Sequence, residues 1–281
     1  MKKTQIDINL PLGKKVFFAS DFHLGSPSYE QSRIREKRII NWIKDHQQEM
    51  GALFLLGDVF DYWFEYRHVV PKGFIRLFGK LAELTDSGID VYFFCGNHDT
   101  WVRDYFQKEL GLRVFSGNAY LHIQGKTFFV GHGDGLGPDD IGYKFIKHLF
   151  DAKISRIFFA WLHPWTGYKL ASGFSKRSRQ ADQLKLNRES YEKKKNANLM
   201  AFMQSTLKSE NIDYFIFAHR HWPMLKEIPY LNNEGKTKQT DQSASKTCQY
   251  LNTGDWIQYF SYGVFDGKDL KLDGVHTAKI F

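Results

Sequence analysis

Leu55-Leu56-Gly57-Asp58 closes a short apolar run, residues 52–56, and places a carboxylate directly after it. A run of this length and composition is typical of a strand buried in the centre of a sheet. Gly57 permits a sharp backbone turn, so Asp58 is expected at the carboxyl end of that strand. Ligand sites in open α/β sheets lie outside this end. The sequence therefore predicts an α/β fold with a functional site at one edge of its sheet.

Four more predicted strands end in the same way, with Asp, Asn or His directly after the last apolar residues. They are residues 15–20, 91–95, 127–130 and 214–218, followed by Asp21-Phe22-His23, Gly96-Asn97-His98-Asp99, Gly131-His132-Gly133-Asp134 and His219-Arg220-His221. In an extended segment, side chains two residues apart point to the same side, so Asp21 and His23 can reach one ion. His219 and His221 repeat that spacing. We interpret the five strand ends as one two-metal site, with Asp58 shared between the metals.

The mixture of carboxylate, amide and imidazole groups indicates which cations this site would take. Such donors suit Mn²⁺, Fe²⁺ or Zn²⁺ better than Ca²⁺, and we expect two divalent ions, with Mn²⁺ the first choice. Two neighbouring cations can clamp a phosphoryl group and activate a water molecule. The expected chemistry is therefore hydrolysis of a phosphate ester or anhydride.

The rest of the chain predicts one domain, residues 1–281, with an inserted helical cap at about residues 139–207. Helical spacing at residues 31–48, 71–84 and 101–110 alternates with the first strands, which favours a parallel sheet covered by helices. Residues 120–130 predict a hairpin turning at Gln124-Gly125, and residues 259–265 predict antiparallel strands at the end. A charged helix is predicted from residue 188 to residue 207. Trp161 and Trp165 in the cap either fill its own core or face lipid.

The amino-acid composition restricts which partners and which cellular location are expected. The formal net charge is +8 and the sequence pI is about 9.2, which suits an anionic partner such as nucleic acid, a phospholipid surface or a phosphorylated substrate. With only Cys95 and Cys248, a disulfide scaffold is not expected and a reduced cytoplasmic state is the simpler interpretation. No signal peptide is recognisable, and no apolar run approaches the roughly 20 residues of a spanning helix. Any membrane contact is therefore expected to be peripheral.

Taken together, the five segments that follow the predicted strands resemble the five conserved sequence blocks of the calcineurin-like metallophosphoesterases. The resemblance extends over about residues 16–222. The resemblance implies a four-layer α/β/β/α sandwich. It implies two metal sites, one held by Asp21, His23, Asp58 and His221 and the other by Asp58, Asn97, His132 and His219. It also implies that His98 lies over the phosphate and assists the leaving group. Ala218 stands where the family usually has Gly.

Softer motifs resemble a narrower group, the UDP-2,3-diacylglucosamine pyrophosphohydrolases of lipid A biosynthesis. These are the segment 57–63, the segment 132–136, and Asp139, Asp140 and Tyr143 beyond it. The resemblance implies hydrolysis of a nucleotide-linked lipid to UMP and 2,3-diacylglucosamine 1-phosphate, at the inner face of a membrane and without a nucleic-acid partner. Many members of that group have Arg where His98 stands. Candidate substrate-binding residues are Asn97, His98, Asp140, Tyr143, Ser175, Lys176, Arg177 and Arg179.

Two other functions stay open at this point. The same metal core would serve a metal-dependent phosphodiesterase or phosphatase that acts on a nucleotide, a nucleic acid or a phosphoprotein. A non-enzymatic scaffold is the third possibility, although such a protein would be expected to lose metal ligands and this chain keeps all seven. The sequence does not indicate an oligomeric state.

Overall fold

The computed structural model describes residues 3–137, 153–170, 173, 188–231 and 247–274. The chain divides into two compact units. The first, here called the sheet unit, contains residues 1–133, 212–228 and 248–281; the second, the insertion unit, contains residues 134–211 and 229–247. The prediction of a single domain with a cap at residues 139–207 stays a prediction.

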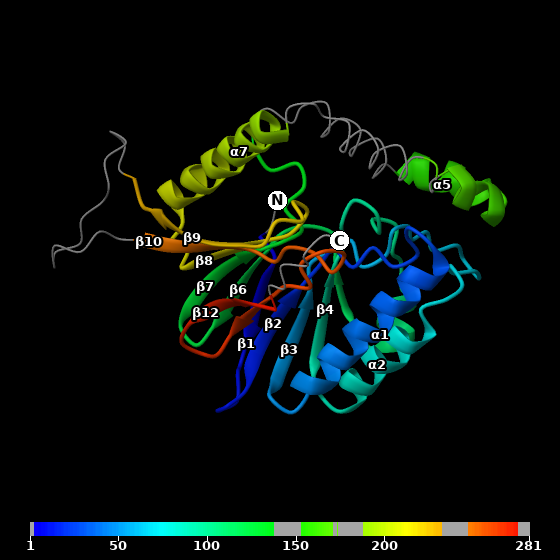
Figure 1. Ribbon diagram of the computed structural model, residues 1–281, viewed down its shortest axis with the longest axis horizontal. Helices are drawn as coiled ribbons and strands as arrows, with labels where there is room; N and C mark the ends of the chain where they lie inside the picture. Colours follow the sequence, from blue (N-terminus) through cyan, green and yellow to red (C-terminus); the bar gives the residue numbers. More distant parts are fainter. Residues whose placement is uncertain (1–2, 138–152, 171–172, 174–187, 232–246, 275–281) are drawn as a thin grey trace. The chain divides into compact units, whose positions relative to one another are not determined.

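One six-stranded sheet of the sheet unit is covered by helices (Figure 1). Its strand order is β12 (Leu270–Asp273), β11 (Tyr262–Phe265), β2 (Lys15–Ala19), β3 (Met50–Leu55), β4 (Asp90–Phe94) and β5 (Arg113–Phe115). Strands β2 to β5 are parallel, and β11 runs antiparallel to both of its neighbours. The crossovers between the parallel strands are α1 (Tyr29–His46), α2 (Ile75–Asp86) and α3 (Tyr105–Leu110). The predicted alternation of strands and helices, and the antiparallel strands at the end, are confirmed.

The second six-stranded sheet also mixes parallel and antiparallel pairs. Its order is β1 (Gln5–Ile8), β6 (Ala119–Ile123), β7 (Lys126–Val130), β8 (Tyr214–Phe217), β10 (Thr247–Asn252) and β9 (Met224–Pro229). Strands β6 and β7 form the predicted hairpin. Its turn residues Gln124 and Gly125 have φ of 49° and 73°, the left-handed pair that a two-residue hairpin turn of matching twist requires.

Alternation along the strands creates two apolar cores. In β2, Phe17 and Ala19 pack with residues of the covering helices, such as Trp42 and Leu77. Val16 and Phe18 belong to the other core, which strands of both sheets line. Each fully buried apolar side chain of this size stabilises the fold by roughly 1.5–3 kcal/mol. Helices, covered sheet and second sheet therefore form successive layers, and the predicted α/β class is confirmed.

One helix begins later than its spacing predicts. The expected helix at residues 101–110 begins only at Tyr105, because the preceding segment is engaged otherwise. Trp101 forms a bridge with Phe64. The buried Glu65 carboxylate accepts the backbone N–H groups of Arg103, Asp104 and Tyr105, and so serves as the cap of α3.

In the insertion unit, the described helices include α5 (Lys153–Trp161) and α7 (Arg188–Ser209), and residues 164–170 are also helical. The long helix predicted at residues 188–207 is confirmed and ends two residues later. The side chains of Ile157, Phe158 and Trp161 in α5 are exposed, as are those of Trp165 and Tyr168 after it. None of the described helices is long and apolar enough to cross a membrane.

Candidate metal centre

The seven proposed ligands all lie in the sheet unit, in loops that follow strands. Asp21 and His23 follow β2, Asp58 follows β3 and Asn97 follows β4 in the helix-covered sheet; His132 follows β7, and His219 and His221 follow β8, in the second sheet. The centre thus draws on strand ends of both sheets.

The backbone of these loops is held in an unusual conformation. Only eight non-glycine residues in the described part of the chain have a positive φ, and five of them are proposed ligands: Asp21, His23, Asp58, His219 and His221. An L residue in the left-handed region costs roughly 1–2 kcal/mol. Strain of this kind persists where a function requires it, so its concentration here supports a functional centre.

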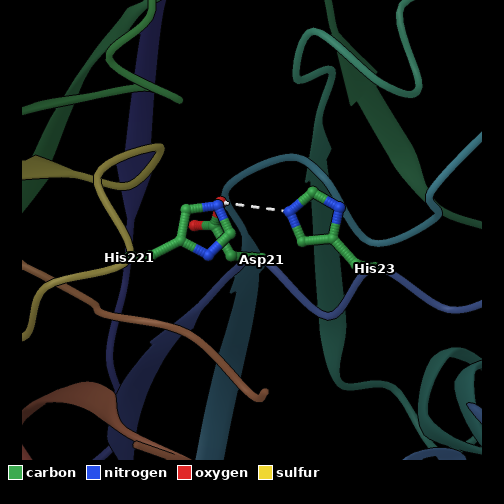
Figure 2. A group of neighbouring side chains, drawn as sticks. All are labelled: Asp21, His23 and His221. Atoms are coloured by element: carbon green, nitrogen blue, oxygen red, sulfur yellow. Dashed lines mark ion pairs between the residues drawn. The ribbon is translucent and has the colours of Figure 1, made fainter. Parts of the chain in front are cut away.

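Asp21, His23 and His221 form one potential metal-binding group, here called the Asp21 group, whose ligand atoms lie within 4.8 Å of one another. Figure 2 shows the Asp21 carboxyl group beside the His221 ring and facing His23. Asp21 Oδ1 lies 3.4 Å from His221 Nε2 and 3.8 Å from His23 Nε2. Its other oxygen accepts hydrogen bonds from Ser20 Oγ at 2.6 Å and from the His219 backbone N–H at 3.1 Å. One oxygen is therefore anchored, and the other points between the two imidazoles.

Asp58, His132 and His219 form a second such group, the Asp58 group. His132 Nδ1 donates to the Leu56 carbonyl at 2.8 Å, which directs Nε2 towards Asp58 Oδ2 at 3.4 Å. The same Nε2 lies 3.1 Å from Asn97 Oδ1. An amide oxygen thus lies beside this group.

Asp58 Oδ2 lies between the two groups, 3.4 Å from His132 and 3.7 Å from His23. Asp58 Oδ1 accepts the backbone N–H of His98 at 2.9 Å. Burial would raise the pKa of this carboxyl group, but His132, His98 and His23 together hold it well below its ordinary range. Asp58 is therefore a carboxylate, placed where a ligand shared by two cations would have to lie.

Several buried polar atoms of the centre fit divalent cations. Asp21 Oδ1 and both ring nitrogens of His23 lack a hydrogen-bond partner among the described residues. Burial favours the neutral His23 ring, yet the carboxylates of Asp21, Asp61 and Asp58 raise its pKa to about 10. A site that attracts a proton so strongly also attracts a cation, and carboxylate, amide and imidazole donors suit Mn²⁺, Fe²⁺ or Zn²⁺.

Two buried side chains hold the loops in place. The Asp99 carboxylate accepts the backbone N–H groups of Asp58, Val59, Phe60 and Gly96, at 2.7–3.3 Å, and so ties the loop after β3 to the loop after β4. Burial and the Asp58 charge raise the pKa of Asp99 to about 7. The Arg35 guanidinium of α1 donates to the carbonyls of Phe22, His23 and Ser26.

His98 lies beside the Asp21 group. Its ring centroid is 4.8 Å from that of His23, at an edge-to-face angle of 84°. Its Nδ1 donates to the Asp61 carbonyl at 2.9 Å, so Nε2 carries the lone pair. Burial lowers the pKa of His98. The neutral ring is therefore the prevailing form at neutral pH.

The structure adds residues that the sequence analysis did not assign. Asp61 Oδ1 lies 3.5 Å from His23 Nδ1, and Asp61, His23 and His98 form a third group of potential ligands. Asp255 Oδ2 lies 3.1 Å from His221 Nδ1. A signal for Asp255 was present, because Gly254-Asp255 follows β10 as Gly57-Asp58 follows β3. The predicted substrate-binding residues Asp140, Tyr143, Ser175, Lys176, Arg177 and Arg179 lie outside the described residues.

The chain is similar to known proteins over most of its length. The sequence model of the calcineurin-like phosphoesterase family matches residues 14–223. A curated relative from Porphyromonas gingivalis, named UDP-2,3-diacylglucosamine hydrolase, is 34% identical and the match covers 94% of this chain and 99% of the relative. A relative of the same name from Vibrio atlanticus is 25% identical, with 95% and 100% covered. Among solved structures, a phosphoesterase from E. coli aligns over 93% of this chain and 100% of its own, with 16% identity and a TM-score of 0.43.

Proposed function

The chain belongs to the calcineurin-like phosphoesterase family and is a metal-dependent hydrolase, and we propose that its substrate is UDP-2,3-diacylglucosamine. Hydrolysis of the pyrophosphate bond would give UMP and 2,3-diacylglucosamine 1-phosphate. The observation that carries this proposal is the near full-length similarity to the Porphyromonas gingivalis protein of that name. The net charge of +8 also suits a substrate that carries two phosphates.

For the metal sites we propose the two sets that the family resemblance implies: Asp21, His23, Asp58 and His221 for one cation, and Asp58, Asn97, His132 and His219 for the other. The support is the Asp58 carboxylate between the two groups and the buried, unpartnered atoms of Asp21 and His23. We propose Mn²⁺ as the native ion.

When bound, two such cations activate a water molecule and neutralise charge on phosphoryl oxygens. The residues of the chain position the reacting groups around them. The Asp61 carbonyl would fix the His98 ring through Nδ1–H, with Nε2 towards the phosphate. To assist the leaving group, Nε2 would first take a proton from solvent and then donate it to the leaving oxygen. The exposed Asn97 side chain would contact the substrate as well as a cation.

A turnover assay on two substrates tests the proposal. With Mn²⁺ present, the full-length protein should hydrolyse UDP-2,3-diacylglucosamine at a kcat/KM at least ~10³-fold above that for bis(p-nitrophenyl) phosphate, since binding energy from the nucleotide and the lipid lowers the barrier only for the matched substrate. Release of UMP measures the first reaction and nitrophenolate the second. A preference for the generic diester would contradict the substrate assignment.

The presence of histidine at position 98 favours a second candidate function, that of a phosphodiesterase or phosphatase acting on another phosphorylated substrate. Histidine at this position is the general phosphoesterase pattern, whereas many of the lipid A enzymes have Arg there. Salt separates a nucleic-acid substrate from the lipid, because nucleic-acid affinity falls steeply as salt rises. We propose the lipid substrate and no nucleic-acid partner, so salt between 50 and 200 mM should change KM little.

We further propose peripheral contact with the inner face of a membrane, through α5 and the residues after it. The exposed fractions of Phe158, Trp161 and Trp165 are 71%, 86% and 60%, and Lys169 lies 3.9 Å from the Trp165 ring centroid. Exposed aromatic residues beside cations are typical of segments that lie in a membrane interface. We also propose a cytoplasmic location, in which Cys95 and Cys248 stay reduced.

Vesicle sedimentation tests this contact. The protein should bind vesicles containing phosphatidylglycerol, and the double substitution of Trp161 and Trp165 by Gln should weaken binding at least ~10-fold, because each buried aromatic side chain contributes roughly 1.5–3 kcal/mol. Trp222→Gln is the matched control, since Trp222 is also exposed but lies in the sheet unit. Equal binding by all three proteins would contradict a role for α5.

A further inference from the structure

Asp255 is a buried carboxylate whose two oxygens have different partners. It follows β10 through Thr253 and Gly254, and only 3% of it is exposed. Oδ1 accepts three backbone N–H groups at 2.8–3.2 Å, those of Ile257, Gln258 and Tyr259. Oδ2 faces His221 Nδ1 at 3.1 Å. The three backbone bonds fix the rotamer of Asp255, so the oxygen that meets His221 is held in place.

The contact determines which nitrogen of His221 carries the proton. A carboxylate only accepts hydrogen bonds, so Nδ1 carries a proton, and in the neutral ring Nε2 carries the lone pair. Nε2 is the atom that lies 3.4 Å from Asp21 Oδ1. This is the tautomer that a metal ligand needs, with its lone pair on the side of the Asp21 group.

His221 depends on this orientation more than the other histidines do. Its side chain is 37% exposed, against 5% for His23 and 1% for His132, so surrounding atoms restrain its ring less. His132 and His98 donate Nδ1–H to neutral backbone carbonyls. His221 donates to a carboxylate, which makes Nε2 a stronger electron donor. The backbone N–H of Trp256 donates to the Asp21 carbonyl at 3.2 Å, which ties the Asp255 segment to the loop after β2.

We propose that Asp255 is the positioning residue of the metal site formed by the Asp21 group, where it sets the tautomer and raises the donor strength of His221. The inference rests on the proposed metal ligands. Loss of such an outer partner typically weakens metal binding by about 10–100-fold. The Asp58 group, which does not contain His221, should keep its affinity.

Asp255→Asn isolates this role from the structural one. The Asn Oδ1 atom can still accept the three backbone N–H groups, but its amide now donates towards His221 Nδ1 and so favours the proton on Nε2. Asp266→Asn is the matched control, because Asp266 Oδ1 also accepts two backbone N–H groups, from Lys268 and Asp269. Its Oδ2 pairs with Lys271, and no histidine of the described residues contacts it. Both variants should melt within a few degrees of the wild-type protein when all are stripped of metal.

Two measurements on the whole chain test whether Asp255 positions His221 for metal binding. Calorimetric titration with Mn²⁺ should show one of two sites weakened about 10–100-fold in Asp255→Asn and neither in Asp266→Asn. In the Zn²⁺-loaded protein, ¹⁵N spectra should show His221 protonated at Nδ1 in the wild type, with that signal lost in Asp255→Asn. If both sites of Asp255→Asn bind Mn²⁺ with wild-type affinity, the role of Asp255 is overturned and the proposed metal centre is not. A wild-type protein that binds no cation would overturn the proposed metal centre as well.

Discussion

Replacement of Asp58 by Asn should lower kcat by about three orders of magnitude and weaken the binding of both cations. Asp58 Oδ2 is the atom that lies between His132 and His23, at 3.4 and 3.7 Å. Two cations contribute several kcal/mol of charge stabilisation to phosphoryl transfer, and about 4 kcal/mol corresponds to roughly 10³ in rate. Losing the charge that both ions share should remove most of that contribution.

The measurement pairs steady-state kinetics with metal analysis after equilibrium dialysis against Mn²⁺. Asp90→Asn serves as the control, because Asp90 is a partly exposed carboxylate at the amino end of β4 whose partner is Arg113 at 3.0 Å. It should keep activity and both ions. If Asp58→Asn loses only one ion, Asp58 belongs to a single site, and if it keeps near-normal activity the shared-ligand proposal fails.

The sequence signal for the proposed centre is local. Each strand end shows an apolar run followed directly by Asp, Asn or His, and the parallel arrangement of strands brings such ends together. The extended backbone that we expected at residues 21–23 and 219–221 was wrong, because Asp21, His23, His219 and His221 all have a positive φ. No residue type at these positions requires the left-handed conformation. It follows from tertiary contacts, such as the bond from the His219 N–H to Asp21.

The parts that sequence analysis missed depend on pairings between distant segments. The expected start of α3 at residue 101 was wrong because Glu65, nearly forty residues earlier, caps the helix at Tyr105. The roles of Asp255 and Asp61 depend on side-chain direction, which spacing alone does not give. The substrate contacts of Asp140, Tyr143 and Arg177 remain predictions.

Removal of the divalent cations should abolish turnover and lower the melting temperature by roughly 10–20 °C. A ligand at 100 times its Kd stabilises the folded state by about 2.7 kcal/mol, so two sites give about 5 kcal/mol. For a chain of about this size, each kcal/mol of unfolding free energy shifts the melting temperature by roughly 2–4 °C. Cation loss should destabilise the fold because the centre is costly without metal. Among the described residues, buried atoms of Asp21 and His23 lack hydrogen-bond partners, and five proposed ligands are held in the left-handed region. Calorimetry before and after chelation, with activity restored by Mn²⁺, measures both effects.

The metal-free protein should in addition become less stable as pH rises. The pKa of His23 is raised from 6.5 to about 10 by its neighbouring carboxylates, so the folded state holds a proton that the unfolded state releases. The stability that this proton contributes is complete below pH 6.5 and is lost progressively as pH rises towards 10.

A cation held by His23 would replace this proton, so the Mn²⁺-loaded protein should show a smaller decline in stability over that pH range. His23→Gln should flatten the metal-free profile. Identical pH profiles for the metal-free and loaded wild-type proteins would mean that His23 does not exchange its proton for a cation.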